Sequence, residues 1–230
     1  MKGLLVTLVV LALLLVGADR LAARFAGAAV ARELQQSQSL SSEPEVSIRG
    51  FPFLTQALRG RYDRIDVTVP QASREGVEVQ DLTAHLRGAR IPLRAALSRT
   101  VTEVPVEQVD ADGLVTYAGL AAGADRRVTI APAGDQLKVT GEVDVLGRTL
   151  TGTAFSTVRL DGRDLVVRAQ RFDVGNGVVN DLLTSVLRDR FDFRVPVGRL
   201  PYGLRLTGAT VTPEGVRVSA AGGATVLRDR

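Results

Sequence analysis

An alternation of apolar and polar residues with a period of two runs through most of this chain and constrains its fold more than any other feature. In the clearest stretch, Leu137, Val139, Val143 and Val145 stand between polar residues. Successive side chains of a strand point to opposite faces, so this spacing predicts strands with one buried face. Similar stretches follow one another across short turns such as Asp161-Gly162, which predicts about ten strands in a mostly antiparallel sheet.

Two departures from this period add curvature and helices. The apolar parity shifts near Gln80–Asp81, which predicts a β-bulge and therefore a bent strand. In 177–190 apolar pairs recur every four residues instead, a pattern typical of a helix lying on a sheet. Shorter helical turns are predicted at Pro92–Leu97 and Tyr117–Leu120. The fold class is α+β: a long, curved, mostly antiparallel sheet wrapped around or covered by one or two long helices.

The amino terminus is an uncharged apolar run of 16 residues, Gly3–Ala18, preceded by Lys2. As a helix it covers roughly 24 Å, less than the roughly 30 Å of a hydrocarbon core. The run is typical of a secretory signal cleaved before Asp19. The alternative is an uncleaved anchor with Arg20 and Arg24 at the headgroups, and a buried core helix is disfavoured because the run is apolar all round. Signal and anchor both imply export.

We divide the chain into residues 1–18, a signal peptide or membrane anchor, and residues 19–230, a single domain. Within the domain, 19–36 has the pattern of an amphipathic helix. This helix either continues the hydrophobic run or begins just after the cleavage point, and its first residue, an aspartate, is the candidate N-cap. Residues 37–44 form a polar connector, and 45–230 form the β-rich body. Export without cysteine suggests a Gram-positive or actinobacterial envelope, at the outer face of the plasma membrane or in a periplasm-like space, either anchored or secreted.

The inventory of reactive side chains excludes most catalytic chemistry. The chain has no Cys and a single His, His85, so thiolate catalysis, disulfide frameworks and Cys/His zinc sites are ruled out. His85 lies on a polar strand face, and the local sequence places neither a carboxylate nor a nucleophile beside it, so we expect a solvent-facing residue without function. Asp110–Gly113 lacks the remaining ligands of a calcium loop. We predict no catalytic residue, no metal site and no cofactor.

The positive charge is a weak indicator of partners. The formal net charge is +4 and the sequence pI is about 10.1. Only Lys2 and Lys138 are lysines, and the arginines are scattered singly rather than clustered. Aromatic residues make up 4% of the chain, which does not suit a nucleic-acid surface built on stacking. We therefore expect no nucleic-acid partner.

The most distinctive segment gathers large apolar residues around a proline. Phe51, Phe53 and Leu54 flank Pro52, and Leu58 follows one helical turn later. One interpretation is structural, a hydrophobic plug that closes one end of the curved sheet. The other is functional, a block that lines the mouth of an apolar cavity or dips into the surface of a bilayer.

The pattern I-x-G-F-P-F-L-T-Q-x(3)-G-x-Y-x-x-I-x-V, from Ile48 to Val67, resembles the LmeA-like phospholipid-binding family of actinobacteria, formerly a domain of unknown function. Val104–Val106, Val115–Ala118 and Val195–Leu204 support the resemblance, which covers most of the chain after the amino-terminal run. The residue after Tyr-Ala is usually acidic or polar in the family, whereas this chain has Gly119 there.

The resemblance implies an envelope protein that binds phospholipid, with a fold similar to the tubular lipid-binding superfamily, in which a long helix and a curved sheet enclose an apolar groove. A mycobacterial relative is associated with lipoglycan synthesis, which this chain would then support. The partners expected are phospholipid and the membrane surface. The alternatives are an envelope scaffold that assists a membrane enzyme by contact, or a lipid hydrolase. The residues expected to contact lipid are Phe51, Phe53, Leu54, Leu58, Val179, Leu182, Leu183, Val186 and Leu187.

Overall fold

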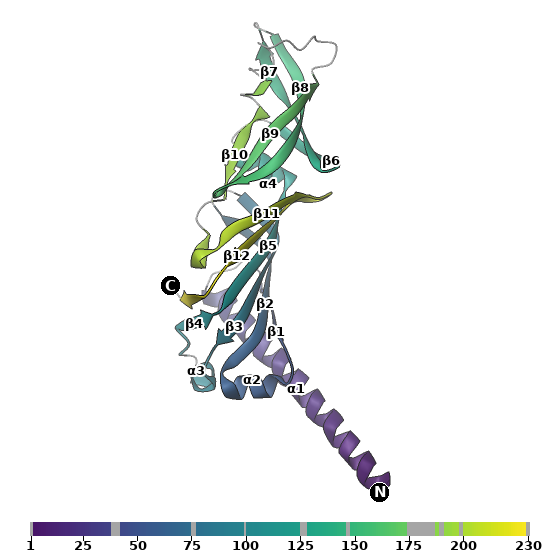
Figure 1. The fold of residues 1–230 in the computed structure, drawn as a ribbon, viewed down its shortest axis with the longest axis vertical. Coiled ribbons are helices and arrows are strands. Elements are labelled where there is room, and N and C mark those ends of the chain that lie inside the picture. Colours follow the sequence, from purple (N-terminus) through teal and green to yellow (C-terminus); the bar gives the residue numbers. More distant parts are fainter. Residues whose placement is uncertain are drawn as a thin grey trace. The chain divides into compact units, whose positions relative to one another are not determined.

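The computed structural model describes residues 2–37, 42–74, 77–98, 100–124, 128–145, 148–173, 187–188, 191–197 and 200–228. Contacts divide the chain into two compact units, whose elements are labelled in Figure 1. Unit 1 comprises Met1–Pro70, Thr83–Asp110 and Gly222–Arg230, and unit 2 comprises Gln71–Leu82 and Ala111–Ala221. The strands β2, β3, β5 and β12 contribute residues to both units, so each unit contains parts of these strands.

The helices are α1 (Lys2–Ser37), α2 (Phe53–Arg59), α3 (Leu93–Ser98), α4 (Tyr117–Gly123) and the 3-10 turn η1 (Pro201–Gly203). The strands are β1 (Glu45–Arg49), β2 (Arg61–Arg74), β3 (Val77–Arg90), β4 (Glu103–Val106), β5 (Gln108–Thr116), β6 (Val128–Ala133), β7 (Gln136–Val145), β8 (Arg148–Asp161), β9 (Asp164–Asp173), β10 (Phe193–Pro196), β11 (Arg205–Val211), β12 (Gly215–Gly222) and β13 (Thr225–Arg228). They form a six-stranded sheet in the order β1-β2-β3-β5-β12-β11, a five-stranded sheet in the order β10-β9-β8-β7-β6, and the ribbon β13-β4.

Helix α1 packs on β1 through a stripe of small residues. Ala23 and Ala31 are buried, and Gly27 lies one turn from each, so the three share one helix face. A Cβ atom on Gly27 would collide with the backbone carbonyl of Val46 in β1. The absence of a side chain at this position therefore permits the close approach of helix and strand.

The apolar run and the predicted helix over 19–36 form one continuous helix, α1. Of the two predicted alternatives, the structure therefore has the helix that continues the run, and the N-cap candidate Asp19 is wrong because it lies inside α1. The Leu, Val and Ala residues before it are themselves helical, so no free N–H groups remain there for a cap to satisfy.

The five-stranded sheet of unit 2 follows the predicted alternation. In β7 the side chains of Leu137 and Val139 are fully buried, whereas Lys138 between them is exposed. Val139 pairs with Ala154 of β8, and β6 to β10 pair as antiparallel neighbours throughout. Figure 1 shows these strands twisted and curled. Gly152 on β8 leaves room for the ring of Phe191, which a Cβ atom there would approach to 3.2 Å.

The predicted fold class, α+β with curved antiparallel strands, is confirmed, with thirteen described strands rather than about ten. The short helices predicted at Pro92–Leu97 and Tyr117–Leu120 are α3 and α4. At the predicted bulge, Asp81 has a left-handed φ of 49° within β3. Of the helix predicted over 177–190, Leu187 and Arg188 are described and are helical, and the rest lies outside the described residues.

The stripe on α1 generates a prediction with an internal control. Replacing Gly27 with Ala should destabilise the protein by about 1–3 kcal/mol, because the new methyl group must displace β1. Gly17 lies in the same helix, with no atom within 4 Å of the position that a Cβ would take. Gly17→Ala should therefore leave stability unchanged or raise it slightly, as Ala favours a helix over Gly. Thermal unfolding followed by circular dichroism measures both, and equal effects would contradict the packing described.

Candidate functional site

The Phe51–Leu58 segment folds into the short helix α2 and its entry turn. Gly50 has a φ of 99°, and Gly60 has a φ of 64°, the left-handed conformation that ends a helix. At that end the Gly60 N–H is directed at the carbonyls of Ala57 and Gln56. The two glycines therefore set where the helix begins and ends, and the sequence between them determines which faces are buried.

Helix α2 has one apolar face in the core and another in solvent. Phe53 and Ala57 are buried, and the Phe53 ring lies 6.3 Å from that of Tyr62. Leu54 and Leu58, one position further along and therefore about 100° around the helix, share a second face and are exposed; 75% of the surface of Leu58 is accessible. An amphipathic helix normally carries polar residues on its outer face, so this outer apolar pair is unusual.

Asp19, a residue of α1, accepts hydrogen bonds from the backbone at the start of α2. Its Oδ2 accepts a hydrogen bond from the Phe53 N–H at 3.0 Å, and its Oδ1 accepts one from the Leu54 N–H at 2.8 Å. Burial alone would raise the pKa of the Asp19 carboxyl, but these two backbone bonds and the Arg20 charge lower it. Asp19 therefore acts as a helix cap, for α2 rather than for its own helix.

Arg20 fastens the entry turn beside this cap. Its guanidinium lies 4.8 Å from the centroid of the Phe51 ring and donates a hydrogen bond of 3.2 Å to the Gly50 carbonyl. The Phe51 side chain nevertheless stays exposed, with 58% of its surface accessible. The arginine thus covers one face of the ring and leaves the rest in solvent.

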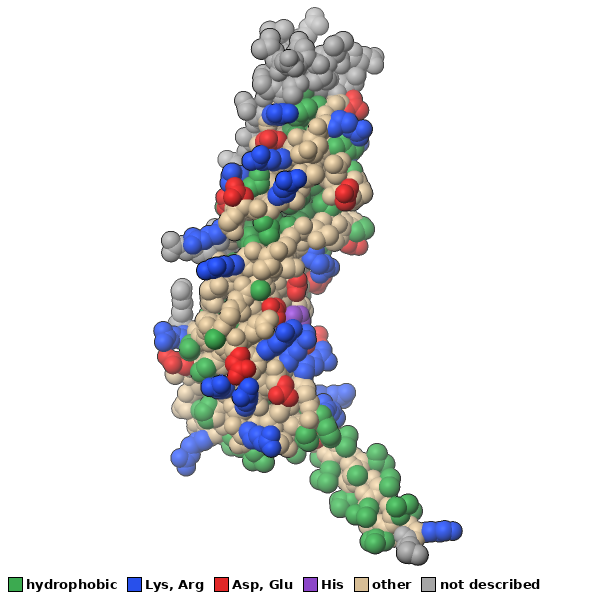
Figure 2. Space-filling view, in the orientation of Figure 1, with side chains coloured by type: hydrophobic (Ala, Val, Ile, Leu, Met, Phe, Trp, Pro, Cys, Tyr) green, Lys and Arg blue, Asp and Glu red, His purple; other side chains and the backbone are tan. Residues whose placement is uncertain are grey.

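Helix α3 adds a further apolar residue on the same side of unit 1. The Ile91 N–H donates to the Gly60 carbonyl at 2.9 Å, so the end of α2 abuts the start of α3, and Figure 1 shows the two helices side by side. Leu97 of α3 is 76% exposed, although nothing in its local sequence distinguishes it. We call the exposed residues Phe51, Leu54, Leu58 and Leu97 the apolar ledge. Figure 2 shows hydrophobic side chains at this end of unit 1.

His85 is part of an ion-pair cluster on β1, β2 and β3. Its Nδ1 lies 2.8 Å from Asp66 Oδ1, and the same carboxylate binds Arg64 Nε at 2.6 Å and Arg49 Nε at 2.9 Å. His85 was expected to face solvent, and its side chain is partly exposed, at 24%; the carboxylate that the local sequence does not offer is supplied by the fold. The reason is that β2 and β3 are neighbours, which brings together residues 19 positions apart.

Asp66 is ionised in this cluster, and three side chains donate hydrogen bonds to its carboxylate. Burial would raise its pKa, but hydrogen bonds from Arg64, His85 and Arg49 lower it below the usual range. A carboxylate with three charged or polar donors is a weak base, because protonation would cost all three interactions. The cluster therefore has the chemistry of a structural network rather than of a general base.

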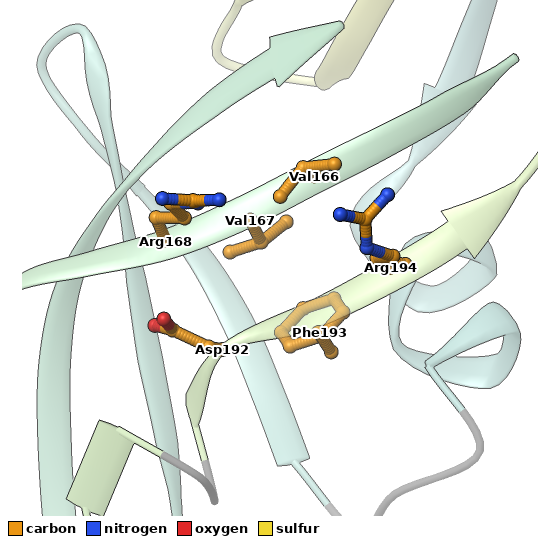
Figure 3. A pocket seen from close by; sticks show the side chains of 6 residues that line it. All are labelled: Val166, Val167, Arg168, Asp192, Phe193 and Arg194. Atoms are coloured by element: carbon orange, nitrogen blue, oxygen red, sulfur yellow. The ribbon is translucent and has the colours of Figure 1, made fainter. Parts of the chain in front are cut away.

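Unit 2 holds a cleft of about 390 Å³ beside β9 and β10. Its lining residues are Val166, Val167, Arg168, Asp192, Phe193 and Arg194. Figure 3 shows the two arginines on opposite sides, with Val167 and Phe193 between them. Arg194 is paired with Asp161 at 2.8 Å, and Asp192 accepts a hydrogen bond of 2.8 Å from the Ala169 N–H. Val167 and Phe193 are almost fully buried, so the charged side chains of the lining form most of the surface that the cleft presents.

The structure separates the residues predicted to contact lipid into two sets. Phe51, Leu54 and Leu58 lie together on the apolar ledge of unit 1, whereas Phe53 is buried beneath them. Leu187 is fully buried in unit 2, where it packs with Phe191 near Gly152. The remaining predicted residues, Val179, Leu182, Leu183 and Val186, lie outside the described residues. Within the described part of the chain, no group of three or more His, Asp or Glu side chains has metal-binding geometry.

Comparison with known families identifies the class of protein to which this fold and surface belong. The family model described as LmeA-like phospholipid-binding matches residues 17–221. This match spans both units and most of the chain, so the protein belongs to the LmeA-like phospholipid-binding family. No curated protein and no solved structure gives a significant match.

The cap between the two helices predicts a local effect. Asp19→Ala should speed amide hydrogen exchange at Phe53 and Leu54 by about an order of magnitude, because both N–H groups lose their acceptor. Asp19→Asn keeps one acceptor oxygen and should give an intermediate rate. Exchange followed by mass spectrometry on peptides covering α2 measures the effect. Unchanged protection in Asp19→Ala would contradict the capping role.

The lowered pKa of Asp66 predicts a pH dependence of stability. Folding favours the ionised form, so its contribution is complete above the unfolded pKa of about 3.9 and is lost as pH falls through the lower folded pKa. Asp66→Asn should cost about 1–3 kcal/mol at pH 7 and flatten the acid limb of the stability curve. Asp161→Asn, in an exposed pair with Arg194, should change stability by less than about 1 kcal/mol.

Urea unfolding between pH 2 and pH 7 measures both variants. Parallel acid limbs for Asp66→Asn and the unmodified protein would show that Asp66 contributes nothing to the pH dependence.

Proposed function

We propose that this protein is a non-enzymatic phospholipid-binding or lipid-shuttling protein of an actinobacterial-type cell envelope. The observation that carries the proposal is its membership of a phospholipid-binding family over residues 17–221. A supporting role in envelope lipoglycan synthesis would follow from the lipid that it delivers or withholds.

The amino-terminal helix supports a location at the outer face of the plasma membrane. Its most apolar window has a mean hydropathy of 2.3, and 6% of that window is buried. This length and composition suit a membrane span and a secretory signal alike. Either one delivers the body of the protein across the membrane, anchored in one case and secreted in the other.

We propose that acyl chains lie in an apolar groove between the curled five-stranded sheet and the helix predicted over 177–190. The burial of Leu187 against this sheet supports that assignment, since Val179, Leu182, Leu183 and Val186 share its apolar stripe in the sequence. Each methylene of an acyl chain buried there would contribute about 0.8 kcal/mol to binding. An arginine such as those beside the cleft of Figure 3 suits the headgroup phosphate.

Binding without catalysis agrees with the chemistry of the only histidine. Its carboxylate partner Asp66 is already bound by Arg49 and Arg64, which favours a structural role for the cluster. The competing functions are an envelope scaffold that assists a membrane enzyme and a lipid hydrolase. Neither of these functions requires a lipid that stays bound during purification. A co-purifying lipid therefore distinguishes the proposed function from both.

Native mass spectrometry of the full chain purified from its own membranes tests the proposal. We expect a phospholipid to co-purify, and Leu183→Asp to lose it while the circular dichroism spectrum is retained, because a charge in the groove opposes an acyl chain. Arg188→Asp is the matched control, since Arg188 is exposed on the same predicted helix and should keep the lipid.

Three outcomes would count against the proposal. A protein that carries no lipid and does not bind liposomes of anionic phospholipid would favour the scaffold function. Turnover of phospholipid by the protein, abolished by His85→Ala, would favour a hydrolase. Unfolding of Leu183→Asp with lipid retained by the milder Leu183→Ala would assign the stripe to the core instead of the groove.

A further inference from the structure

The apolar ledge exposes four large side chains that the fold does not use. Phe51, Leu54, Leu58 and Leu97 are all accessible, although Phe53 and Ala57 in the same helix show that α2 has a buried face available. Large apolar side chains exposed close together in this way mark an interaction site when packing does not need them. The question is which partner covers it.

The position of the ledge along α1 identifies the partner. The apolar run ends at Ala18, and the next residue, Asp19, is hydrogen-bonded to the first two N–H groups of α2. Helix α2 therefore begins where α1 leaves its apolar section. If that section lies in a bilayer, α2 must lie at the bilayer surface, since the two bonds fix the spacing between the helices.

The charges around the ledge suit anionic headgroups. Arg59 of α2 and Arg94 of α3 are exposed and form no ion pair with the described residues. Arg20 lies on the Phe51 ring, next to the same turn. Of the exposed acids near these helices, Glu107 is paired with Arg61 at 3.0 Å, and Asp63 lies beside Gly50. Apolar tips flanked by such arginines are the pattern of an interfacial membrane surface.

We propose that the apolar ledge docks into an anionic phospholipid bilayer, on the face of the membrane where α1 emerges. Phe51, Leu54, Leu58 and Leu97 enter the boundary between headgroups and acyl chains, and Arg59 and Arg94 bind phosphates. This docking rests on the envelope location proposed above, but it does not depend on the protein holding a lipid in a groove.

The lack of cysteine in the sequence allows a direct test on the full chain. Single variants Leu58→Cys and Leu97→Cys, labelled with an environment-sensitive fluorophore, are reconstituted in vesicles of phosphatidylcholine with phosphatidylglycerol. We expect brominated acyl chains to quench both labels and iodide in the buffer to lose access to them. Lys138→Cys, exposed on β7 of unit 2, is the control. Its label should not be quenched by brominated acyl chains and should stay accessible to iodide.

Two results would overturn the docking proposal. Labels that stay open to iodide would show that the ledge faces water, and labels shielded from iodide but untouched by brominated lipid would show that protein covers it. In vesicles of phosphatidylcholine alone, or in the double variant Arg59→Gln/Arg94→Gln, we expect weaker quenching. Unchanged quenching in both experiments would show that Arg59 and Arg94 do not contribute to docking.

A further variant separates this proposal from the proposed function. In Leu58→Glu/Leu97→Glu, we expect brominated lipid no longer to quench a label on Leu54→Cys, because two charges on the ledge oppose its insertion. If phospholipid still co-purifies with this variant, the ledge is needed for docking into the bilayer but not for holding a lipid. Quenched ledge labels in a protein that carries no lipid would support docking and reject the groove.

Discussion

Two hydrogen bonds to one carboxylate connect the amino-terminal helix to the most distinctive segment of the chain. Asp19 is buried, and a buried charge is costly unless it is matched by donors. The match comes from the free N–H groups at the start of α2, which no residue inside that helix can satisfy. The positions of Phe51 and Leu54 relative to the apolar section of α1 therefore depend on this contact. Arg20 adds a hydrogen bond and a ring contact at the same turn, and α1 packs on β1 further along the helix.

Local patterns were sufficient for the strands and the short helices. The alternation around Leu137 and Val139 reflects a sheet with one buried face, and the core of unit 2 is built on those residues. Contacts between distant residues could not be predicted in this way. Asp19 bonds residues 34 and 35 positions away, and His85 meets Asp66 across two strands. A single sequence contains the partners of such contacts but not the strand order that brings them together.

In the candidate site, the sequence predicted which residues are apolar but not which of them are buried. The sequence marked Phe51, Phe53, Leu54 and Leu58 as one apolar block, but burial depends on the rotation of α2 about its axis. That rotation turns Phe53 towards Tyr62 and leaves Leu54 and Leu58 in solvent. A segment of seven residues is too short for periodicity to define its buried face when both faces are apolar. Leu97 was missed because its neighbours gave no such block.

The fold shows which arginines are paired with acids and which are not, information that the sequence alone does not contain. In the sequence they are dispersed and carry little information about partners. In unit 1 most of those described are matched: Arg49 and Arg64 share Asp66, and Arg61 and Arg90 share Glu107. Pairing cancels much of their charge locally, so the field of this unit is determined by the arginines and acids that have no ion-pair partner among the described residues. Those on α2 and α3 flank the exposed leucines, and a net positive charge beside an apolar surface favours an anionic bilayer over a neutral protein partner.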